Sequence, residues 1–391
     1  MNEGTAAPVL FEEKAAVGGA RIGFATLNAE KTLNALSLDT IDLLSARLST
    51  WAGDPGIALV VLQATGEKAF CAGADLHRLH RAMLEHRASA RPEDFRGNAY
   101  ALAFFGREYR LDYAIHTFPK PLLCWGHGIV MGGGVGLMMG ASHRVVTEQS
   151  RVAMPEINIG LYPDVGGSWM LGRMPGKLGL FLALTAAQLS GSDALFAGIA
   201  DYLIPQPSKG LVFDRLLAQR WTASTSRNRA LLTDLLRTFT DSSPAPGSAR
   251  QHFDLINSLC GYGQLIEIVD AITSCKVDDP WLTRASATLA RGSPSTAALS
   301  YELQNRVRLL SLADVFRVEL VAAMNCTIRP DLAEGIRALL IDKDQKPRWQ
   351  PAALAAVTPE WVEGFLSSPW SAREHPLADL GLSPQTKKDV V

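Results

Sequence analysis

The sequence predicts an α/β core followed by a helical C-terminal lobe, and three observations indicate this architecture. In the first half of the chain, short apolar runs typical of strands alternate with amphipathic patterns typical of helices. Beyond about residue 205 the strand patterns stop and helical patterns dominate. The chain has 391 residues, which exceeds the usual size of one hydrophobic core. We therefore expect a core over residues 1–205 and a helical lobe over residues 206–391.

The strands expected in the core are short apolar runs. They cover residues 22–27, 57–62, 122–125, 144–147 and 152–154. Residues 37–51 are expected to form a helix with one apolar face, which carries Leu38, Ile41, Leu44 and Leu48. A second helix is expected after residue 75, with an apolar face made of Leu76, Leu79 and Met83. This alternation predicts sheets covered by helices.

The lobe is expected to be helical because its leucines recur at helical spacing. They are Leu211, Leu216 and Leu217, then Leu231, Leu232, Leu235 and Leu236, followed by the patterns at 299–310 and 312–324. Residues 242–248 contain two prolines and a glycine and are the clearest loop or linker.

The stretch from 121 to 167 carries the strongest chemical signal. A glycine run at 132–136 could open a helix and aim unpaired N–H groups at a developing oxyanion, because glycine adopts positive φ and has no side chain. Two carboxylates follow, Glu156 and Asp164, which could supply a nucleophile, a base or an acid. From spacing alone, the glycines could equally serve helix packing, and the carboxylates a helix cap and a surface charge.

Residues 68–75, with the sequence Lys-Ala-Phe-Cys-Ala-Gly-Ala-Asp, form a second source of free N–H groups. This segment follows an expected strand and precedes an expected helix, so it is a small-residue turn at a helix start. Two such turns together favour acyl chemistry.

With both turns in view, the chain resembles the crotonase (enoyl-CoA hydratase/isomerase) superfamily, and within it the 3-hydroxyisobutyryl-CoA hydrolase family. The matching segments are 69–75, 104–109, 128–136, 154–156, 163–167, 181–185, 197–201 and 333–344. The last of these looks like the signature that separates these hydrolases from shorter relatives. The resemblance implies a crotonase-like spiral of repeated ββα turns, which periodicity alone does not specify.

The resemblance assigns the oxyanion-hole N–H groups to Ala74 and Gly133. Glu156 matches the catalytic glutamate of the family and Asp164 its catalytic aspartate. Glu156 is expected either to attack the carbonyl, giving a mixed anhydride, or to activate water as a base, and the sequence leaves both open. Asp164 is expected to orient water or handle a proton, with a purely helix-capping role as the alternative.

Glu108 matches the acidic residue with which the family contacts the acyl part of the substrate, and an anionic acceptor suits a hydroxyl there. From the pattern alone, Glu108 between Arg107 and Arg110 would lie on a solvated helix face. Gly132 and Gly133 are also expected to contact the substrate. The residues expected to contact coenzyme A are Lys68, Ala69, Ala72, Asp75 and, as a further candidate cation, Lys120.

The chain departs from the hydratase pattern at Gly136, where hydratases have a second catalytic glutamate. Hydration therefore loses one of its two acid/base groups, while Asp164 supplies a carboxylate where hydratases usually have none. Ala74 stands where the hydrolases often have glycine, which retains the N–H but narrows the acyl pocket. His127 replaces a more usual acidic residue and is expected to be a hydrogen-bonded core histidine, with substrate contact as the alternative.

Composition excludes several other classes. With 38 basic and 39 acidic residues, no charge excess favours nucleic acid. Five cysteines without a C-x-x-C pair argue against a zinc site and a disulfide framework, so we expect no metal. No dinucleotide or P-loop motif appears, and coenzyme A is expected only as part of the substrate. No apolar run reaches the length of about 18 residues needed to span a membrane, and the acidic N-terminal segment predicts a cytoplasmic protein.

The sequence therefore predicts a thioesterase that acts on a short-chain 3-hydroxyacyl-CoA, with 3-hydroxyisobutyryl-CoA in valine breakdown as the best single substrate. A thioester needs little acid assistance, because its leaving thiol has a pKa near that of cysteine, about 8.5. An enoyl-CoA hydratase or isomerase is the enzymatic alternative, and a non-catalytic acyl-CoA binding protein is the alternative from another class. The superfamily commonly forms trimers or hexamers, so a homo-oligomer is left open.

Overall fold

A computed structural model gives the structure of the protein and describes residues 7–240 and 243–382. The chain forms two compact units, and each unit is assembled from three stretches of sequence. The first unit comprises Met1–Ala74, Ala114–Val152 and Leu189–Gln251, and the second comprises Asp75–Tyr113, Ala153–Gln188 and His252–Val391. Because the chain alternates between the units, neither coincides with the expected ranges 1–205 and 206–391.

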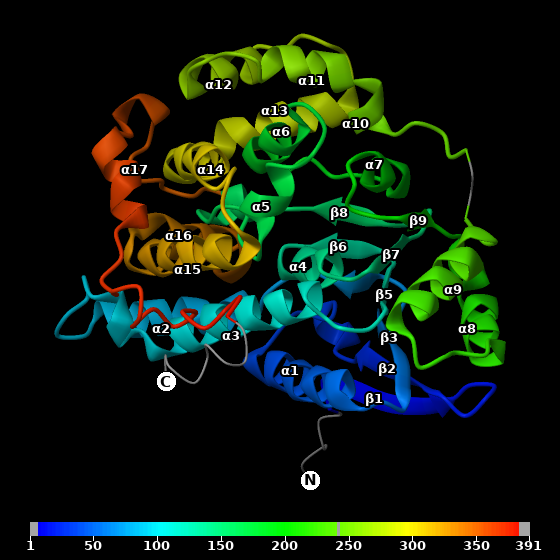
Figure 1. Ribbon diagram of the computed structural model, residues 1–391. Helices are drawn as coiled ribbons and strands as arrows, with labels where there is room; N and C mark the ends of the chain where they lie inside the picture. Colours follow the sequence, from blue (N-terminus) through cyan, green and yellow to red (C-terminus); the bar gives the residue numbers. More distant parts are fainter. Residues whose placement is uncertain (1–6, 241–242, 383–391) are drawn as a thin grey trace. The chain divides into compact units, whose positions relative to one another are not determined.

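A six-stranded sheet is the centre of the first unit (Figure 1). In spatial order its strands are β1 (Val9–Ala15), β2 (Arg21–Leu27), β3 (Ile57–Ala64), β5 (Leu122–Gly126), β7 (His143–Val146) and β9 (Tyr202–Leu203). β1 is antiparallel to β2, and the other pairs are parallel. Almost every side chain of β3 is buried, as is typical of a parallel strand covered on both faces.

The strands and the first helix confirm the sequence pattern to within one or two residues at their ends. The helix expected at 37–51 is α1 (Leu38–Gly53), and the Ser37 side chain caps it by accepting a hydrogen bond from the Thr40 N–H. The pattern missed β1 because most of its side chains are exposed and charged. It also missed the two-residue strand β9, which is too short to show a period.

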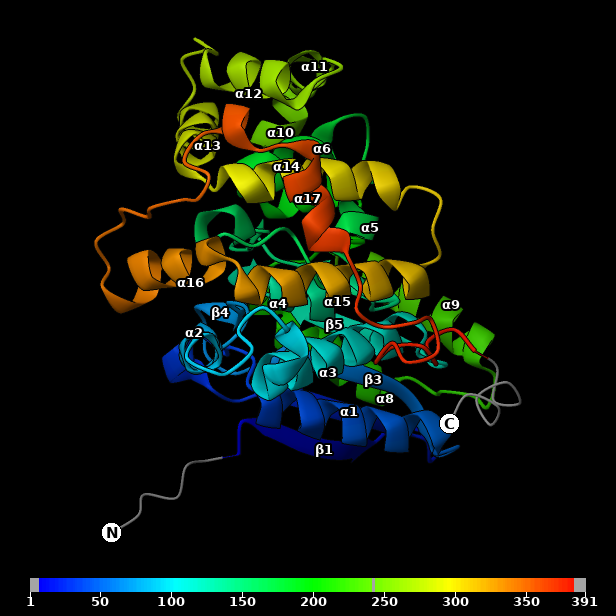
Figure 2. The same ribbon diagram turned by 90° about the vertical axis from the view of Figure 1, so that its left-hand side faces the viewer.

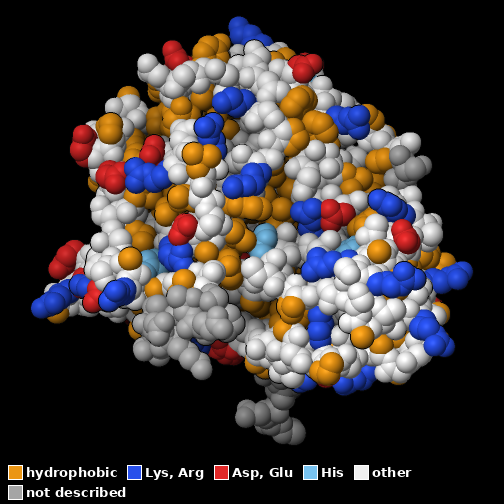
Figure 3. Space-filling model, viewed as in Figure 1, with side chains coloured by type: hydrophobic (Ala, Val, Ile, Leu, Met, Phe, Trp, Pro, Cys, Tyr) orange, Lys and Arg blue, Asp and Glu red, His pale blue; other side chains and the backbone are white. Residues whose placement is uncertain are grey.

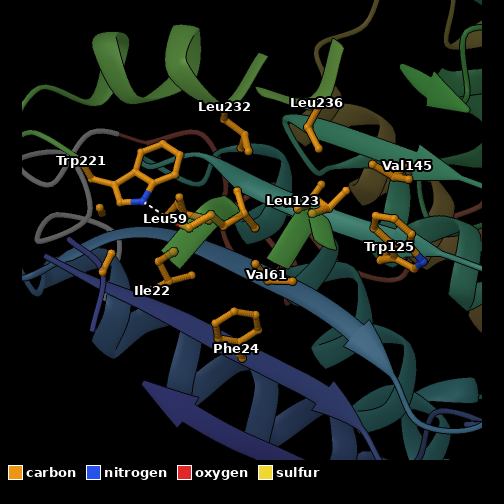
Figure 4. Close-up of a cluster of buried hydrophobic side chains, with 14 of the residues drawn as sticks. Ile22, Phe24, Leu59, Val61, Leu123, Trp125, Val145, Trp221, Leu232 and Leu236 are labelled. Carbon is orange, nitrogen blue, oxygen red and sulfur yellow. Dashed lines mark hydrogen bonds between the residues drawn. The ribbon is translucent and has the colours of Figure 1, made fainter. Parts of the chain in front are cut away.

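Two helices that follow the last strand cover this sheet. They are α8 (Lys209–Ala218) and α9 (Thr225–Arg237), and their leucines Leu216, Leu232 and Leu236 are fully buried in a cluster with the sheet (Figure 4). The sheet contributes side chains such as Phe24, Val61 and Trp125 to this cluster. Each fully buried side chain of this size stabilises the fold by about 1.5–3 kcal/mol. These helices lie beyond residue 205, yet they belong to the unit that holds the sheet.

A smaller sheet contains β4 (Ala69–Cys71), β6 (Ile129–Met131) and β8 (Arg151–Ala153), in that order. β4 and β6 are parallel, with Ala69 opposite Ile129. The glycine run that follows β6 opens α4 (Gly133–Met139), as the sequence predicts. Two short helices, α7 (Gly191–Phe196) and α10 (Ser248–Gln251), also belong to the first unit.

The second unit is helical (Figure 2). Its helices are α2 (Leu76–Arg87), α3 (Ala99–His116, in this unit up to Tyr113), α5 (Gly167–Leu171), α6 (Leu178–Thr185), α11 (Phe253–Leu259), α12 (Leu265–Thr273), α13 (Pro280–Arg291), α14 (Pro294–Arg306), α15 (Leu312–Ile328), α16 (Pro330–Ile336) and α17 (Pro359–Leu366). Most residues of α15 are buried, and it packs against α2, α5, α16 and α17. The helical pattern at 299–310 is partly wrong, since α14 ends at Arg306. Of the expected linker, Ser242 lies outside the described residues, and 243–247 form no helix or strand.

Acidic and basic side chains are interspersed over the face of the molecule seen in Figure 3, in agreement with the near-zero net charge. Within the described residues, no helix is both long enough and apolar enough to cross a membrane. None of the five cysteines, all of which lie in the described residues, is in a disulfide, and four of them are buried, as expected of packing residues.

Candidate active site

Two turns in the first unit present unpaired backbone N–H groups. β4 and β6 are parallel neighbours, so the turns that follow them lie at the same edge of the small sheet. Within the described residues, the N–H groups of Ala74 and Gly133 donate to no acceptor. Gly133 is the first residue of α4, where a helix leaves its N–H groups unsatisfied. The structure therefore brings together the two segments from which the sequence predicts an oxyanion hole.

The glycines in these turns are required by the backbone. Gly73 has φ of +102° and Gly132 has φ of +52°, in the left-handed region that favours glycine. A Cβ atom on Gly73 would lie 3.3 Å from the Met131 carbonyl oxygen and 3.9 Å from the Gly133 nitrogen, so the two turns touch. On Gly134 it would lie 2.4 Å from the Cys71 carbonyl oxygen. Gly134 thus serves packing, while Gly133 leaves its N–H free.

The residues expected to contact coenzyme A have different surroundings. Lys68 is exposed, whereas Ala69 is buried and its carbonyl accepts from the Asn34 side chain at 2.9 Å. The Ala72 N–H donates to the Leu33 carbonyl at 3.0 Å. Asp75 caps α2 by accepting from the His77 N–H.

Lys120, the further candidate cation, is occupied by a structural role. Its ammonium donates to the Trp51 carbonyl at 2.6 Å and to the Asp54 carbonyl, which ties the chain before β5 to the end of α1. Two such bonds leave Lys120 little freedom to bind a phosphate, so its role as a coenzyme A ligand is not supported by the structure.

Five carboxyl groups are buried close together in the second unit. They are Glu108 (2% exposed), Asp112 (0%), Glu156 (4%), Asp164 (5%) and Glu319 (0%). Burial and mutual repulsion raise the pKa of Glu108, Asp112 and Glu156 well above their usual ranges. Within the described residues, no group of three or more acid, His or Cys side chains is arranged to hold a metal ion. Because acids buried this close together cannot all be ionised, bound protons offset part of the charge of this cluster.

Asp164 is the member of this cluster whose carboxyl group is paired with a tyrosine hydroxyl. Its Oδ2 atom accepts a hydrogen bond from the Tyr109 hydroxyl at 2.7 Å. Burial raises the pKa of Asp164 to about 6, while the Tyr109 hydrogen bond opposes that rise by stabilising the charged form. Burial and the Asp164 charge raise the pKa of Tyr109, which therefore stays a neutral donor. A carboxyl group of this kind can exchange a proton near neutral pH.

Glu319, on α15, holds the loop that carries Asp164. Its carboxyl oxygens accept from the Gly166 N–H at 2.7 Å and the Ser168 N–H at 3.0 Å. These amides open α5, so Glu319 fills the role that capping by Asp164 would have filled. The capping alternative for Asp164 is therefore wrong. Val165, next to Asp164, has φ of +53°, an unfavourable conformation for a β-branched residue that these hydrogen bonds help to maintain.

The Glu156 turn is held by the C-terminal signature segment. Glu156 opens a 3₁₀ turn (Glu156–Ile159), and α16 packs on this turn. A Cβ atom on Gly335 would lie 2.4 Å from the carbonyl carbon of Ile159, so only glycine allows the two backbones to approach this closely. Gly160, with φ of +73°, is similarly close to the backbone of Asp331. The signature at 333–344 therefore includes a support for the Glu156 turn.

Gly335→Ala is expected to destabilise the protein by about 1–3 kcal/mol, as overpacking in a core does. It is also expected to lower catalytic turnover, because the Glu156 turn has to move away from the added methyl group. Thermal unfolding and a thiol-release assay check these effects. Gly210→Ala in α8 is the control, since a Cβ atom there meets nothing within 4 Å. If Gly335→Ala behaves like this control, the turn is not supported by α16.

Glu108 lies on the buried face of α3, while the neighbouring Arg107 is exposed. The alternative of a solvated helix face is therefore wrong for Glu108. His127 is buried, and its Nε2 atom lies 2.9 Å from the Gly66 carbonyl oxygen, as expected for a core histidine. Gly136 is buried inside α4.

Sequence reasoning missed two acids of the carboxyl cluster, Glu319 and Asp112, and also Tyr109, which donates a hydrogen bond to Asp164. Glu319 is the only acid among the apolar residues at 315–324, and a charged residue on so apolar a helix could have been singled out. Asp112 follows Glu108 at helical spacing, which could have placed the two on one face. Nothing in the sequence indicates that Tyr109 reaches Asp164.

Comparison with known proteins agrees with this architecture. The family model described as enoyl-CoA hydratase/isomerase matches residues 22–366. The chain belongs to the enoyl-CoA hydratase/isomerase family. A solved structure named an enoyl-CoA hydratase from Rhodobacter sphaeroides 2.4.1 is 34% identical, with a TM-score of 0.78 over 93% of this chain and 98% of that one. A carnitinyl-CoA dehydratase from Mycobacterium thermoresistibile is 32% identical, with a TM-score of 0.79 over 93% and 97%. The crotonase-like fold predicted from the sequence is confirmed.

Curated relatives of high similarity carry one name. The 3-hydroxyisobutyryl-CoA hydrolase, mitochondrial, of Gallus gallus is 37% identical over 92% of this chain and 88% of its own length. The protein of the same name from Homo sapiens is 34% identical over 92% and 88%. These relatives confirm the resemblance to 3-hydroxyisobutyryl-CoA hydrolases within the crotonase superfamily.

Proposed function

We propose that this protein hydrolyses the thioester of a short-chain 3-hydroxyacyl-CoA, and that its substrate is 3-hydroxyisobutyryl-CoA, formed in valine breakdown. The observation that carries this proposal is the environment of the Asp164 carboxyl group. Its carboxyl is buried, hydrogen-bonded by Tyr109 and set in a loop held by Glu319, with a pKa of about 6. The names of the curated relatives support the same reaction.

The developing charge on the thioester oxygen is the main barrier to this reaction. We assign its stabilisation to the N–H groups of Ala74 and Gly133, which have no other acceptor within the described residues. Each such donor typically contributes about 3–4 kcal/mol to the transition state. The order of motifs shared with the family supports pairing these donors with the carboxyl groups of Glu156 and Asp164.

One proton shared by Glu156 and Asp164 accounts for the hydrolysis. In the free protein Glu156 holds this proton more tightly than Asp164, because the pKa of Glu156 is raised further. In the state in which the proton has passed to Asp164, Glu156 is ionised and attacks the carbonyl carbon or removes a proton from water. In the first route the C–S bond breaks, Asp164 protonates the leaving thiolate, and a mixed anhydride with Glu156 remains. Water then cleaves the anhydride while ionised Asp164 takes up its proton. The products are the hydroxy acid and coenzyme A, and both carboxyl groups return to their first state.

Glu108 is proposed to accept the hydrogen bond of the acyl hydroxyl, and Gly132 and Gly133 are proposed to contact the substrate through their backbone. A site built around such an acceptor rejects an analogue that lacks the hydroxyl, because the acceptor is then left unpaired. Coenzyme A is proposed to enter as part of the substrate, with no further cofactor. The contacts proposed for it are Lys68, Ala69, Ala72 and Asp75.

Hydration of an enoyl-CoA is the second candidate reaction, and the printed names of the two solved structures favour it. Gly136 opposes this reaction, because it leaves no carboxylate on the glycine-opened helix. A protein that only binds acyl-CoA would need neither Glu156 nor Asp164. A cytoplasmic location stays a prediction, and the curated relatives are named as mitochondrial proteins. A homo-oligomer also stays a prediction.

A panel of CoA esters, followed for free thiol and for the enoyl chromophore, tests this function. We expect thiol release from 3-hydroxyisobutyryl-CoA or 3-hydroxypropionyl-CoA, because Glu108, Glu156 and Asp164 are all present. We expect little hydration of crotonyl-CoA, because Gly136 lacks the second acid/base group. Efficient hydration of crotonyl-CoA without thiol release would contradict the proposal. Tight binding of the esters without turnover would favour the binding protein.

A further inference from the structure

Asp112 is a buried acid to which the proposed reaction gives no role. It lies on α3, is 0% exposed, and neither of its carboxyl oxygens has a hydrogen-bond partner among residues 7–240 and 243–382. The charged groups that act on it are Glu108 on the same helix, Asp164 and Glu319 on α15, and all three are acids. Leaving a charged or polar group buried without a partner is costly, so a carboxyl group in this place needs an explanation.

Glu108 has the same unmet requirement, and it lies one helical turn away. Residues four apart on a helix have Cβ atoms about 5–6 Å from each other. The Oε1 atom of Glu108 is shielded from solvent and has no hydrogen-bond partner within the described residues. Its Oε2 atom does not combine these two properties. Glu108 Oε1 and both carboxyl oxygens of Asp112 are therefore buried, unpartnered acceptors on adjacent turns of α3.

Two neighbouring buried acids without a cation cannot both ionise, but they can share one proton. A protonated Asp112 has an O–H group to donate, and Glu108 Oε1 is an unpartnered acceptor on the next turn. The charge then belongs on Glu108, because both oxygens of Asp112 are buried without a partner, whereas only the Oε1 atom of Glu108 is.

We propose that Asp112 is a positioning residue for acyl recognition: it retains a proton, shares it with Glu108, and so fixes the Glu108 carboxylate toward the hydroxyl of the acyl chain. This inference rests on the proposed function, in which Glu108 accepts the hydrogen bond of that hydroxyl. Asp112 itself does not touch the substrate. It determines how strongly the protein prefers a hydroxylated acyl group over the same group without the hydroxyl.

Two substitutions at Asp112 separate this role from simple packing. Asp112→Leu keeps a similar volume but removes the donor, and Asp112→Asn keeps a donor that cannot ionise. Both proteins are expected to fold, because Asp112 makes no hydrogen bond that the substitutions would break. Ser300→Ala is the control, since Ser300 is another buried residue of this unit whose hydroxyl has no partner.

The measurement is the ratio of kcat/KM for 3-hydroxyisobutyryl-CoA to that for isobutyryl-CoA. Asp112→Leu is expected to lower this ratio about tenfold through the KM of the hydroxylated ester, the size expected from weakening one hydrogen bond to a charged group. Asp112→Asn and Ser300→Ala are expected to stay within about threefold of wild type, since neither removes the donor to Glu108. The preference in Asp112→Asn should also persist to higher pH than in wild type, because asparagine has no proton to lose.

The proposal is overturned if Asp112→Leu keeps the wild-type ratio, if Asp112→Asn loses it equally, or if both esters are affected alike. Binding of the two esters, measured by calorimetry in Glu156→Gln protein, gives an answer that does not depend on hydrolysis. If wild type releases no thiol, the proposed function fails. A Kd preference for the hydroxylated ester that Asp112→Leu removes and Asp112→Asn keeps would still support the pairing, and equal Kd values for the two esters would overturn it.

Discussion

Glu156→Gln is expected to lower kcat for thioester hydrolysis by at least about 100-fold while the protein still binds its substrate. Glutamine keeps the size of the side chain but can neither attack the carbonyl as a carboxylate nor take a proton from water. The loss should appear in kcat more than in KM, because the interaction removed is made mainly in the transition state. Thiol release at saturating substrate gives kcat, and calorimetry gives the binding.

Glu85→Gln is a suitable control for this experiment. Glu85 is an exposed acid on α2, in the same unit as Glu156. It should keep wild-type turnover. Turnover of Glu156→Gln near that of wild type would remove Glu156 from the mechanism, and the Ala74 and Gly133 donors would then have to act with another group.

Asp164→Asn is expected to cause a comparably large fall in hydrolysis, with a melting temperature within a few degrees of wild type at neutral pH. Asparagine retains an oxygen that accepts from Tyr109, so the loop loses little. The Gly166 and Ser168 amides stay bound to Glu319. What disappears is the proton that Glu156 and Asp164 share. For a chain of 391 residues one degree corresponds to about 0.8 kcal/mol, so a few degrees correspond to about 2–3 kcal/mol.

The stability of this variant should also depend on pH in a defined direction. Burial raises the pKa of Asp164 to about 6 in the folded protein, above its ordinary value of 3.8. The folded protein therefore holds the Asp164 proton more tightly than the unfolded chain, and the contribution of Asp164 to wild-type stability falls as pH rises from about 4 to 6. The asparagine side chain of the variant does not titrate. The melting temperature of Asp164→Asn relative to wild type should rise across this interval, and differential scanning calorimetry measures it.

Asp193→Asn provides the matched control for Asp164, because Asp193 is a buried acid in the capping box of α7. It should lose stability while its kcat stays within about threefold of wild type, since its role is to cap a helix. If Asp164→Asn behaves in the same way, losing stability but not activity, Asp164 is structural and the hydrolase proposal loses its main support.

Local order along the chain was sufficient to predict the strands, the first helix and the glycine turns. The parallel strands appear as short apolar runs because both of their faces are buried, and α1 shows its face by helical spacing. The glycine turns at 73 and 132 could also be located from local sequence, because glycine is the residue that readily adopts their positive φ. The motifs and their order were also sufficient to identify the family, which the comparisons confirm.

The residues that hold Glu156 and Asp164 in place could be identified only from contacts between segments that are distant in the sequence. The Glu319 carboxyl meets the Asp164 loop about 150 residues away in sequence, at hydrogen-bond distances of 2.7 and 3.0 Å, and no local pattern encodes such a contact. In the sequence, Gly335 is one residue of the signature segment. Its role in packing follows from the close approach of its backbone to Ile159, which the structure shows. Lys120 could be recognised as structural only from the carbonyl groups that its ammonium binds. Burial raises the pKa of Asp164 and Glu319. Burial is a property of the folded chain, because it depends on every segment packed around the group.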